Sequence, residues 1–319
     1  MRILITGGAG CLGASLIEHL VPAGHELLII DNFATGKRGN LPTAAAGVAL
    51  VEGSIVDKEL VDRAFDTFVP THVIHSAASY KDPNDWLEDA RTNVIGTIHV
   101  ANAAIRVGVR RVLNFQTALC YGRTDQTPIP ATHPLRPFTS YGISKVAGEQ
   151  VLLAAGLSCA SLRIANVTGP RLVIGPIPTF YKRLKAGLKC FCSATVRDFL
   201  DVSDFIALID RALADDGPCG IFNVAAGEGH TIKEVFDIVV DHLGVSLLEP
   251  VPIVPAAVDD VPNVVLDRSE TERAFDWRPL VSFEQAVRRT LSWYDVHGVS
   301  DVYSHMKAPA SVSGAAGTG

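Results

Sequence analysis

A glycine-rich turn joins the first apolar run to the first helical pattern, and it constrains the fold more than any other feature of this sequence. The run Arg2–Thr6 reads as a buried strand, and the turn after it reads Gly-Gly-Ala-Gly-Cys-Leu-Gly. Gly7, Gly10 and Gly13 have the spacing GxxGxxG, which permits a tight turn, a close approach of phosphate to backbone, and close packing of helix on strand. A helix that begins here directs its N-terminus at the anion. The segment therefore predicts a βαβ unit that binds the pyrophosphate of a dinucleotide.

Strand and helix patterns alternate through the first half of the chain, which is typical of a parallel sheet with helices on both faces. We therefore predict an α/β fold with a Rossmann-type doubly wound parallel sheet. The predicted strands are Arg2–Thr6, Glu26–Ile30, Val48–Glu52, His72–His75, Arg111–Phe115 and Ser158–Ile164. The predicted helices between them are Leu12–Val21, Lys58–Phe68, Asp85–Val107 and Tyr141–Ala154.

The alternation fades after about Ala165, where Gly-Pro and Ile-Pro pairs punctuate a loop-rich stretch. We expect residues 1–165 to form the dinucleotide-binding domain and residues 198–226 to return to it. Residues 166–305 are expected to form mainly a smaller C-terminal substrate domain, interleaved with the first. The small and polar tail, residues 306–319, is expected to be disordered. The helical patterns of this half are Phe180–Ala186, Ser203–Leu213, Ile232–Leu243 and Phe283–Tyr294.

Composition narrows the class of protein. The net charge is −6 and no basic block is present, so we expect no nucleic-acid partner. No apolar stretch reaches the roughly 18 residues that span a bilayer, so we expect no membrane partner. The six cysteines are scattered, with only Cys190 and Cys192 close together, and they predict free thiols in the cytoplasm rather than a metal site.

An acidic residue at the end of the second predicted strand indicates which dinucleotide binds. Asp31 can accept hydrogen bonds from both ribose hydroxyls of NAD, and its charge repels the 2′-phosphate of NADP. Lys37 and Arg38 lie near enough in sequence to hold such a phosphate, but Asp31 sits directly at the strand end. The alternative is a solvated turn at residues 31–33. We predict NAD as the cofactor.

Tyr141 and Lys145 are four residues apart at the start of a predicted helix, so they share one helical face. A neighbouring ammonium is expected to lower the pKa of the phenol from about 10 and make it a usable proton acceptor. Thr117 follows the fifth predicted strand, at the carboxyl edge where open α/β sheets bind ligands. Its hydroxyl can hydrogen-bond the oxygen that Tyr141 deprotonates. These three residues predict a hydride-transfer site.

From Met1 to about Tyr294 the sequence resembles the extended short-chain dehydrogenase/reductase family, and within it the sugar-nucleotide epimerases of the UDP-glucose 4-epimerase type. Many motifs carry the resemblance, and they occur in the family's order. They are ITGGAGxLG at the start, IIDNFATGKRGNL around Asp31, His75–Ala78 (like HLAA), Asn93–Thr97 (like NVxGT), Tyr141 with Lys145 (YxxxK), Arg163–Arg171 (like LRxxNVYGPR), Val196–Phe199 (like RDF) and Phe222–Val224 (like YNxG).

The resemblance implies a set of site residues. Thr117, Tyr141 and Lys145 match the catalytic set. The cofactor positions are Gly7, Gly10, Cys11, Leu12, Gly13, Asp31, Asn32, Ser54, Ile55, Ala77, Ala78, Tyr141 and Lys145. The substrate positions are Lys81, Thr117, Asn166, Phe191 and Arg197. No metal ligand is implied, and relatives suggest a homodimer through the helical patterns 85–107 and 141–154.

Three departures from the family pattern concern the ligands. Ser54 stands where an aspartate often touches adenine, and the turn around Phe191 lacks the usual glycines and aspartate. Residues 255–260 contain no arginine, although relatives grip the diphosphate there. Either Arg197 is the main clamp, or Arg171, Lys182 or Arg183 shares the task. An ion pair between Arg197 and the adjacent Asp198 is the structural alternative.

The residues after Thr117 bear on the reaction. Family dehydratases and decarboxylases use an acid just after the catalytic hydroxyl, whereas this chain has Ala118, Leu119 and Cys120. The remaining chemistry is oxidation and re-reduction at one carbon. We expect a nucleotide-diphosphate-sugar epimerase, acting at carbon 4 of a UDP-hexose or its uronic acid through a 4-keto sugar. The alternative is an NAD-dependent sugar-nucleotide dehydrogenase or 4-ketoreductase with net redox turnover, and a third class is a silent cofactor-binding regulator.

Overall fold

A seven-stranded parallel sheet forms the centre of the molecule in the computed structural model, which describes residues 1–42, 47–80, 82–257 and 260–302. The strand order is β11-β6-β5-β4-β1-β2-β3, and every neighbouring pair is parallel. Its strands are β1 (Arg2–Thr6), β2 (Glu26–Asp31), β3 (Val48–Glu52), β4 (His72–His75), β5 (Arg111–Thr117), β6 (Cys159–Ile164) and β11 (Gly220–Val224). The order reverses between β1 and β4, so a ligand site is expected at that edge.

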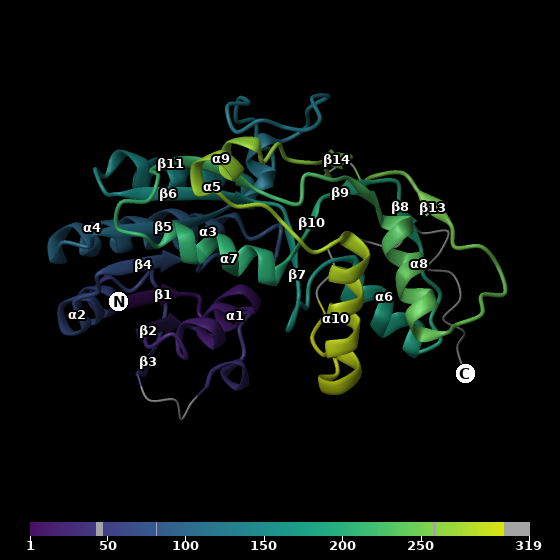
Figure 1. Cartoon of the computed structure of the whole chain (residues 1–319), viewed down its shortest axis with the longest axis horizontal. Coiled ribbons are helices and arrows are strands. Elements are labelled where there is room, and N and C mark those ends of the chain that lie inside the picture. The colour runs from purple at the N-terminus through teal and green to yellow at the C-terminus, as the bar shows by residue number, and fades with distance from the viewer. Residues whose placement is uncertain (43–46, 81, 258–259, 303–319) are drawn as a thin grey trace.

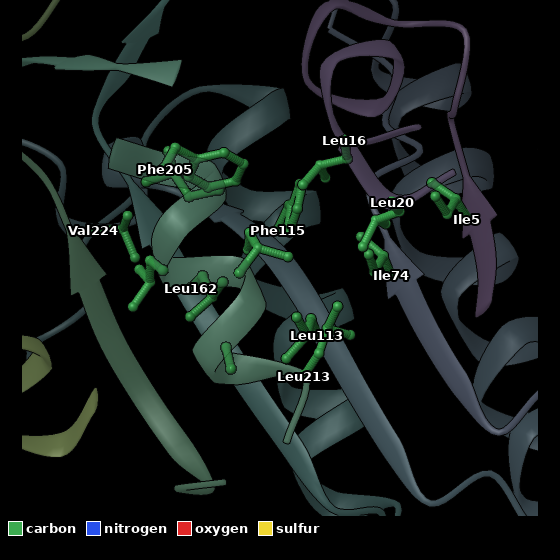
Figure 2. Close-up of a cluster of buried hydrophobic side chains, with 14 of the residues drawn as sticks. Ile5, Leu16, Leu20, Ile74, Leu113, Phe115, Leu162, Phe205, Leu213 and Val224 are labelled. Carbon is green, nitrogen blue, oxygen red and sulfur yellow. The ribbon is translucent and has the colours of Figure 1, made fainter. Parts of the chain in front are cut away.

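Helices cover both faces of this sheet, as the alternating pattern predicts (Figure 1). Successive strand residues point to opposite faces, so Ile3 and Ile5 belong to one buried cluster and Leu4 to the other. Figure 2 shows the first cluster, where Leu16 and Phe205 from helices meet strand residues such as Phe115. The helices are α1 (Cys11–Leu20) and α7 (Val202–Ala212) on this face, and α2 (Lys58–Phe68), α4 (Thr97–Val107) and α5 (Ser140–Ala154) on the other.

The predicted doubly wound parallel sheet is confirmed, but the single helix predicted over 85–107 is wrong. The chain forms α3 (Trp86–Ala90), a π-helical turn over Arg91–Gly96, and then α4. The wider turn carries Asn93, whose side chain bonds to Ser79 and to Ser144 of α5. The periodicity of apolar residues does not reveal such a turn, because the turn depends on the hydrogen bonds that the Asn93 side chain makes.

The second half adds short strands and four helices beside the carboxyl edge of the sheet. A third core cluster fills the space between α6, α8 and α10, with Phe180 and Phe236 in edge-to-face contact. The helices are α6 (Pro176–Lys185), α8 (Ile232–Leu243), α9 (Ser269–Phe275) and α10 (Phe283–His297). The short strands are β7 (Asn166–Thr168), β8 (Cys192–Ser193), β9 (Val196–Arg197), β10 (Phe199–Asp201), β12 (His230–Thr231), β13 (Ile253–Val254) and β14 (Asn263–Val264).

The sequence did not predict α9, because this helix has only seven residues, with Thr271 and Phe275 buried, which is too short a run to reveal a helical period. α6 begins earlier than predicted, because Pro176 suits the first turn of a helix. The return of α7 and β11 to the large sheet is visible in Figure 1, while the exact domain boundaries stay a prediction. The predicted disordered tail, residues 306–319, lies outside the described residues. Among the helices that the structure describes, none is both long and apolar enough to cross a membrane.

Candidate active site

The glycine loop between β1 and α1 has the close contacts that its spacing predicts. Gly7 has a φ of +71°, and a Cβ there would meet the Ala77 nitrogen at 2.7 Å. A Cβ on Gly13 would meet the Gly7 carbonyl oxygen at 2.6 Å, so the helix can approach the loop only without it. A Cβ on Gly10 would meet only that same oxygen, at 3.4 Å. Packing alone therefore does not require glycine at Gly10, whereas a phosphate resting on the helix N-terminus does, so the loop fits a dinucleotide.

Asp31 ends β2 and is held by the backbone on two sides. One carboxylate oxygen accepts a hydrogen bond from the Ala9 nitrogen at 2.8 Å, and the other accepts one from the Phe33 nitrogen at 2.8 Å. Burial raises the pKa of Asp31, and the two backbone donors oppose this effect. Each oxygen keeps a lone pair for a ribose hydroxyl. Asp31 is therefore part of the loop structure and not a solvated turn.

The two cations considered for a 2′-phosphate are occupied by acids. Lys37 donates to Asp301 at 2.8 Å, and Arg38 pairs with Glu52 while its guanidinium lies over the Phe33 ring. Both pairs are solvent-exposed, and such pairs contribute little energy, so they do not decide between NAD and NADP. The preference for NAD rests on the carboxylate of Asp31.

The remaining cofactor candidates lie at the ends of neighbouring strands. Ser54 follows β3, and its hydroxyl accepts a hydrogen bond from the Val56 nitrogen at 3.2 Å. Ala77 follows β4, and its nitrogen donates to the Thr6 hydroxyl at 3.2 Å. Because parallel strands end at one edge, these positions lie along the same rim as the glycine loop. Cys11 and Leu12 begin α1, Asn32 is exposed after β2, buried Ile55 follows Ser54, and Ala78 follows Ala77.

The predicted catalytic side chains come together between β5 and α5. Thr117 is the last residue of β5, and its hydroxyl hydrogen-bonds to Tyr141 in the first turn of α5. Thr139 caps that helix by accepting from the Gly142 nitrogen at 3.1 Å. Gln116 donates to the Lys145 carbonyl oxygen at 2.8 Å, which fixes the helix against the strand. Local capping and one side-chain bond thus set the position of the tyrosine and lysine.

The expected low pKa of Tyr141 is wrong for the protein alone. Burial raises the pKa of the phenol above its ordinary value, the charges of Tyr80 and Asp89 raise it further, and only the Thr117 bond lowers it. The four-residue spacing predicted that the ammonium of Lys145 is close to Tyr141, but it did not predict that the phenol is largely removed from water. In this state Tyr141 holds its proton, so a further positive charge is needed before it acts as a base.

Lys145 is 4% exposed, and burial lowers the pKa of its amine to about 8, against the raising effect of Glu149. It is therefore mostly charged at pH 7. Two other titratable side chains near the site, His75 and Cys120, are 1% and 0% exposed, and both ring nitrogens of His75 already lie within hydrogen-bond distance of threonine hydroxyls. Tyr141 is partly exposed, so it is the group at this place that a substrate hydroxyl can reach.

Beneath the site runs a hydrogen-bonded chain that sequence reasoning did not identify. The Nδ1 of His75 lies 2.8 Å from the Thr6 hydroxyl, and its Nε2 lies 2.9 Å from the Thr97 hydroxyl. Thr97 in turn donates to the Asn93 carbonyl oxygen at 2.8 Å. The HLAA-like motif was the available signal, and the structure shows His75 as a buried link between β1, β4 and α4.

The substrate candidates surround the end of β6. Asn166 starts β7 just after β6, and its side chain donates to the Asp198 carbonyl oxygen at 3.1 Å. Phe191 is half-buried, immediately before β8. Lys81 lies outside the described residues. Asn166 is thus at the same sheet edge as Thr117, whose partner in β6 is Ile164.

Arg197 forms an internal ion pair, as the structural alternative drawn from the sequence expects, but its partner is Asp260 and not the adjacent Asp198. Its guanidinium donates to Asp260 at 2.6 Å, while Asp198 accepts backbone N–H groups, including those of Ala226 and Gly227. Burial raises the pKa of Asp198 to about 6 despite these donors. Asp260 was missed because it is 63 residues away from Arg197 in sequence. A substrate phosphate bound at Arg197 would share the guanidinium with Asp260 or displace the Asp260 carboxylate from it.

Two of the other candidate diphosphate clamps are occupied by contacts within the chain. Arg171 pairs with Glu18 of α1, and Arg183 donates to the Lys189 carbonyl oxygen at 2.9 Å. Lys182 is exposed on α6. Arg197 is paired as well, with Asp260, so occupancy within the chain does not separate these candidates, and Arg197 is favoured because the RDF-like motif contains it.

Known proteins resemble the chain over most of its length. The family model "NAD dependent epimerase/dehydratase family" matches residues 3–225. The crystal structure of the Bordetella bronchiseptica enzyme WbmG in complex with NAD and UDP is 63% identical, with a TM-score of 0.92, covering 97% of this chain and 99% of that one. UDP-glucose 4-epimerase from Thermotoga maritima, solved with UDP-glucose, is 28% identical with a TM-score of 0.86, covering 93% and 99%.

A curated relative gives the same result from sequence. UDP-glucose 4-epimerase of Mycolicibacterium smegmatis is 29% identical over 311 residues, covering 92% of this chain and 98% of the relative. These matches confirm the fold, the resemblance and the predicted cofactor. The chain belongs to the NAD dependent epimerase/dehydratase family, and its cofactor is NAD.

Proposed function

We propose that this chain epimerises the sugar of a nucleotide-diphosphate sugar, at carbon 4 of a UDP-hexose or its uronic acid. The observation that carries the proposal is the set of side chains between β5 and α5. Thr117, Tyr141 and Lys145 are together, and the turn after Thr117 holds no acid. Elimination and decarboxylation lack their usual catalyst there, whereas oxidation and re-reduction at one carbon need none.

NAD bound at the glycine loop supplies a hydride acceptor that later returns the hydride. Tyr141 takes the proton of the sugar's 4-hydroxyl, and Thr117 hydrogen-bonds the same oxygen. Lys145 lies one helical turn from Tyr141 and, together with the positive nicotinamide of bound NAD, would supply the charge that a phenolate needs. When the hydride returns to the other face of the 4-keto sugar, Tyr141 gives the proton back to the oxygen. The phenol therefore ends in its starting state, and no net oxidant is used.

Uridine is proposed as the nucleotide because the 63% identical WbmG structure contains UDP. The direct test incubates the purified protein with UDP- and dTDP-sugars without added NAD. Epimer formation under these conditions supports the proposal. The alternative, net dehydrogenase or ketoreductase turnover, is supported instead if product forms only with added NAD or NADH and the cofactor accumulates in the opposite redox state.

A homodimer is proposed from the exposed face of α4 and α5. Ile98 and Ile105 on α4 and Ile143 on α5 are more than a third exposed. A second copy packed there would form a four-helix contact and bury these apolar side chains. Ile98→Asp should convert a dimer mass into a monomer mass by light scattering, and Val296→Asp, an exposed position on α10, should not. A monomeric wild-type mass at micromolar concentration would exclude this assembly.

A further inference from the structure

Gln116 is a buried polar residue whose side chain bonds to two of the proposed catalytic residues at once. It is 3% exposed and immediately precedes Thr117 in β5. Its side-chain oxygen accepts a hydrogen bond from the Thr117 nitrogen at 2.7 Å, and its side-chain nitrogen donates to the Lys145 carbonyl oxygen at 2.8 Å. Both ends of the amide are therefore used, and an apolar side chain of the same length could make neither bond.

The end of β5 is paired with a strand on one side only. β4 ends at His75, which pairs with Asn114, whereas β6 continues beside β5 until Ile164 pairs with Thr117. In the described sheet, Thr117 therefore lies beyond the end of β4 and has a strand neighbour in β6 alone. The side chain of Gln116 supplies a further bond to the backbone of Thr117 at this exposed end of the strand.

The same amide joins β5 to the helix that carries Tyr141 and Lys145. These two residues lie one turn apart on α5, and the hydroxyl of Thr117 hydrogen-bonds to Tyr141. The first turn of α5 packs on the turn that follows Thr117, because a Cβ on Gly142 would meet the Leu119 carbonyl oxygen at 3.2 Å. The amide thus closes a loop of contacts between the end of the strand and the first two turns of the helix.

The next turn of α5 is attached to the sheet by different contacts. Glu149 forms a buried ion pair with Arg163 of β6 at 2.8 Å, and it also accepts a hydrogen bond from the Ser161 hydroxyl at 2.6 Å. These contacts hold the helix against the sheet independently of Gln116. Loss of the Gln116 bonds should therefore disturb the catalytic end of the helix and leave the rest of it in place.

We propose that Gln116 is a positioning residue that holds the Thr117 hydroxyl and the Tyr141 phenol in the geometry that proton transfer requires. The proposal rests on the proposed function, in which both hydroxyls bond the same sugar oxygen as it loses a proton and later regains it. Because Gln116 is buried, it acts through these residues and not on the sugar. A misplacement of about 1 Å can lower a rate by about 100-fold while every reacting group is still present.

The variant Gln116→Met removes both hydrogen bonds and keeps a side chain of similar length. Asn114→Leu is the matched control, because Asn114 is a buried amide that points to the same face of β5 two residues earlier. The Asn114 side chain donates to the Ser161 hydroxyl at 3.0 Å and not to a proposed catalytic residue. Gln116→Asn keeps an amide that is one methylene too short to span both backbone groups, so it provides the same test if Gln116→Met does not fold.

Turnover is measured on the NAD-loaded full chain with the UDP-sugar that wild type converts fastest. We expect Gln116→Met to lower kcat by about 10- to 100-fold, with KM and NAD content close to the wild-type values. Asn114→Leu should keep kcat close to wild type. The melting temperature should fall by comparable amounts in the two variants, because each loses the hydrogen bonds of a buried amide.

A double-variant comparison tests whether Gln116 acts through Thr117. Thr117→Val removes the hydroxyl that Gln116 is proposed to place. Gln116→Met should therefore lower kcat much less in the Thr117→Val background than in wild type, because residues that act together have non-additive effects. An equal factor in both backgrounds would show that Gln116 does not act through Thr117, and the assignment would be overturned.

The remaining outcomes separate the assignment of Gln116 from the proposed function. If kcat falls equally in Gln116→Met and Asn114→Leu, or if the loss of Gln116→Met appears in KM alone, Gln116 serves the fold or binding and the proposed function stands. If wild type converts none of the UDP- and dTDP-sugars, the proposed function is overturned, and the assignment of Gln116 to that reaction falls with it.

Discussion

The cofactor end of the site and its substrate end satisfy their acidic side chains in different ways. Asp31, at the cofactor end, accepts backbone hydrogen bonds from Ala9 and Phe33, both at 2.8 Å. At the substrate end, Asp260 is paired with the guanidinium of Arg197 from a distant segment. The cofactor end satisfies its acid with the protein's own backbone, whereas the substrate end pairs two charged side chains that a ligand phosphate could separate.

The largest expected effect lies between the two ends, at Tyr141. Tyr141→Phe keeps the buried ring and removes only the hydroxyl, so turnover should fall by roughly two to four orders of magnitude. NAD content and melting temperature should stay close to wild type, which absorbance of the purified protein and a thermal scan measure. Lys145→Met should be at least as damaging. Retention of more than about a tenth of the wild-type rate by Tyr141→Phe would mean that the proton travels by another route.

The next effect tests how the cofactor end holds its buried acid, Asp31. Asp31→Asn presents an N–H group to a backbone donor, so it should lose about 1–3 kcal/mol of stability and should bind NAD more weakly. This loss should appear as a lower melting temperature of the cofactor-free protein. The cofactor-free protein is used because bound NAD would itself add stability. An unchanged melting temperature with unchanged NAD affinity would show that the two backbone donors do not hold the Asp31 carboxylate in place.

Arg197 tests whether the substrate end is held by a ligand or by its ion pair. Arg197→Ala should raise KM for the sugar nucleotide by about 10-fold or more, because a guanidinium bonds a phosphate in a planar fork. The melting temperature should change little, since Asp260 is a third exposed and water can solvate it. Arg197→Lys keeps the positive charge but lacks the planar fork, so its KM should lie between the KM of wild type and that of Arg197→Ala. A large loss of melting temperature with unchanged KM would assign Arg197 to the fold.

The smallest effect concerns the buried chain beneath the cofactor end. The pKa of His75 is about 3 in the folded protein, well below its ordinary value of 6.5. The unfolded chain therefore binds more protons between these values, so stability is complete above pH 6.5 and is lost as pH falls toward 3. His75→Gln should flatten this part of the acid dependence, measured by urea unfolding at several pH values. An unchanged acid slope would exclude His75 as a source of the acid sensitivity.

Local rules predicted the cofactor end of the site. Gly7 has a positive φ, and there is no room for a Cβ at Gly13. Glycine is therefore required at both positions in any sequence that forms this turn. Because strands and helices alternate, the carboxyl ends of the parallel strands lie at one edge of the sheet. This rule placed Asp31 and Thr117 correctly at that edge. The same logic explains why six of the seven strands of the described sheet were predicted to within about two residues, whereas β11 was represented only by the motif Phe222–Val224.

Only the tertiary structure decided the substrate end and the protonation of the site. The Arg197–Asp260 pair joins residues far apart in sequence, and the hydrogen bonds of Asn93 to Ser79 and Ser144 depend on a π-helical turn. The pKa of Tyr141 is raised because its ring is buried, a quantity that spacing along a helix does not contain. The sequence by itself determined the fold class, the glycine loop and the positions of the catalytic side chains, because these follow from local backbone geometry and short-range periodicity. Burial and long-range charge pairing exist only once distant segments pack together, so they could not be predicted from the sequence.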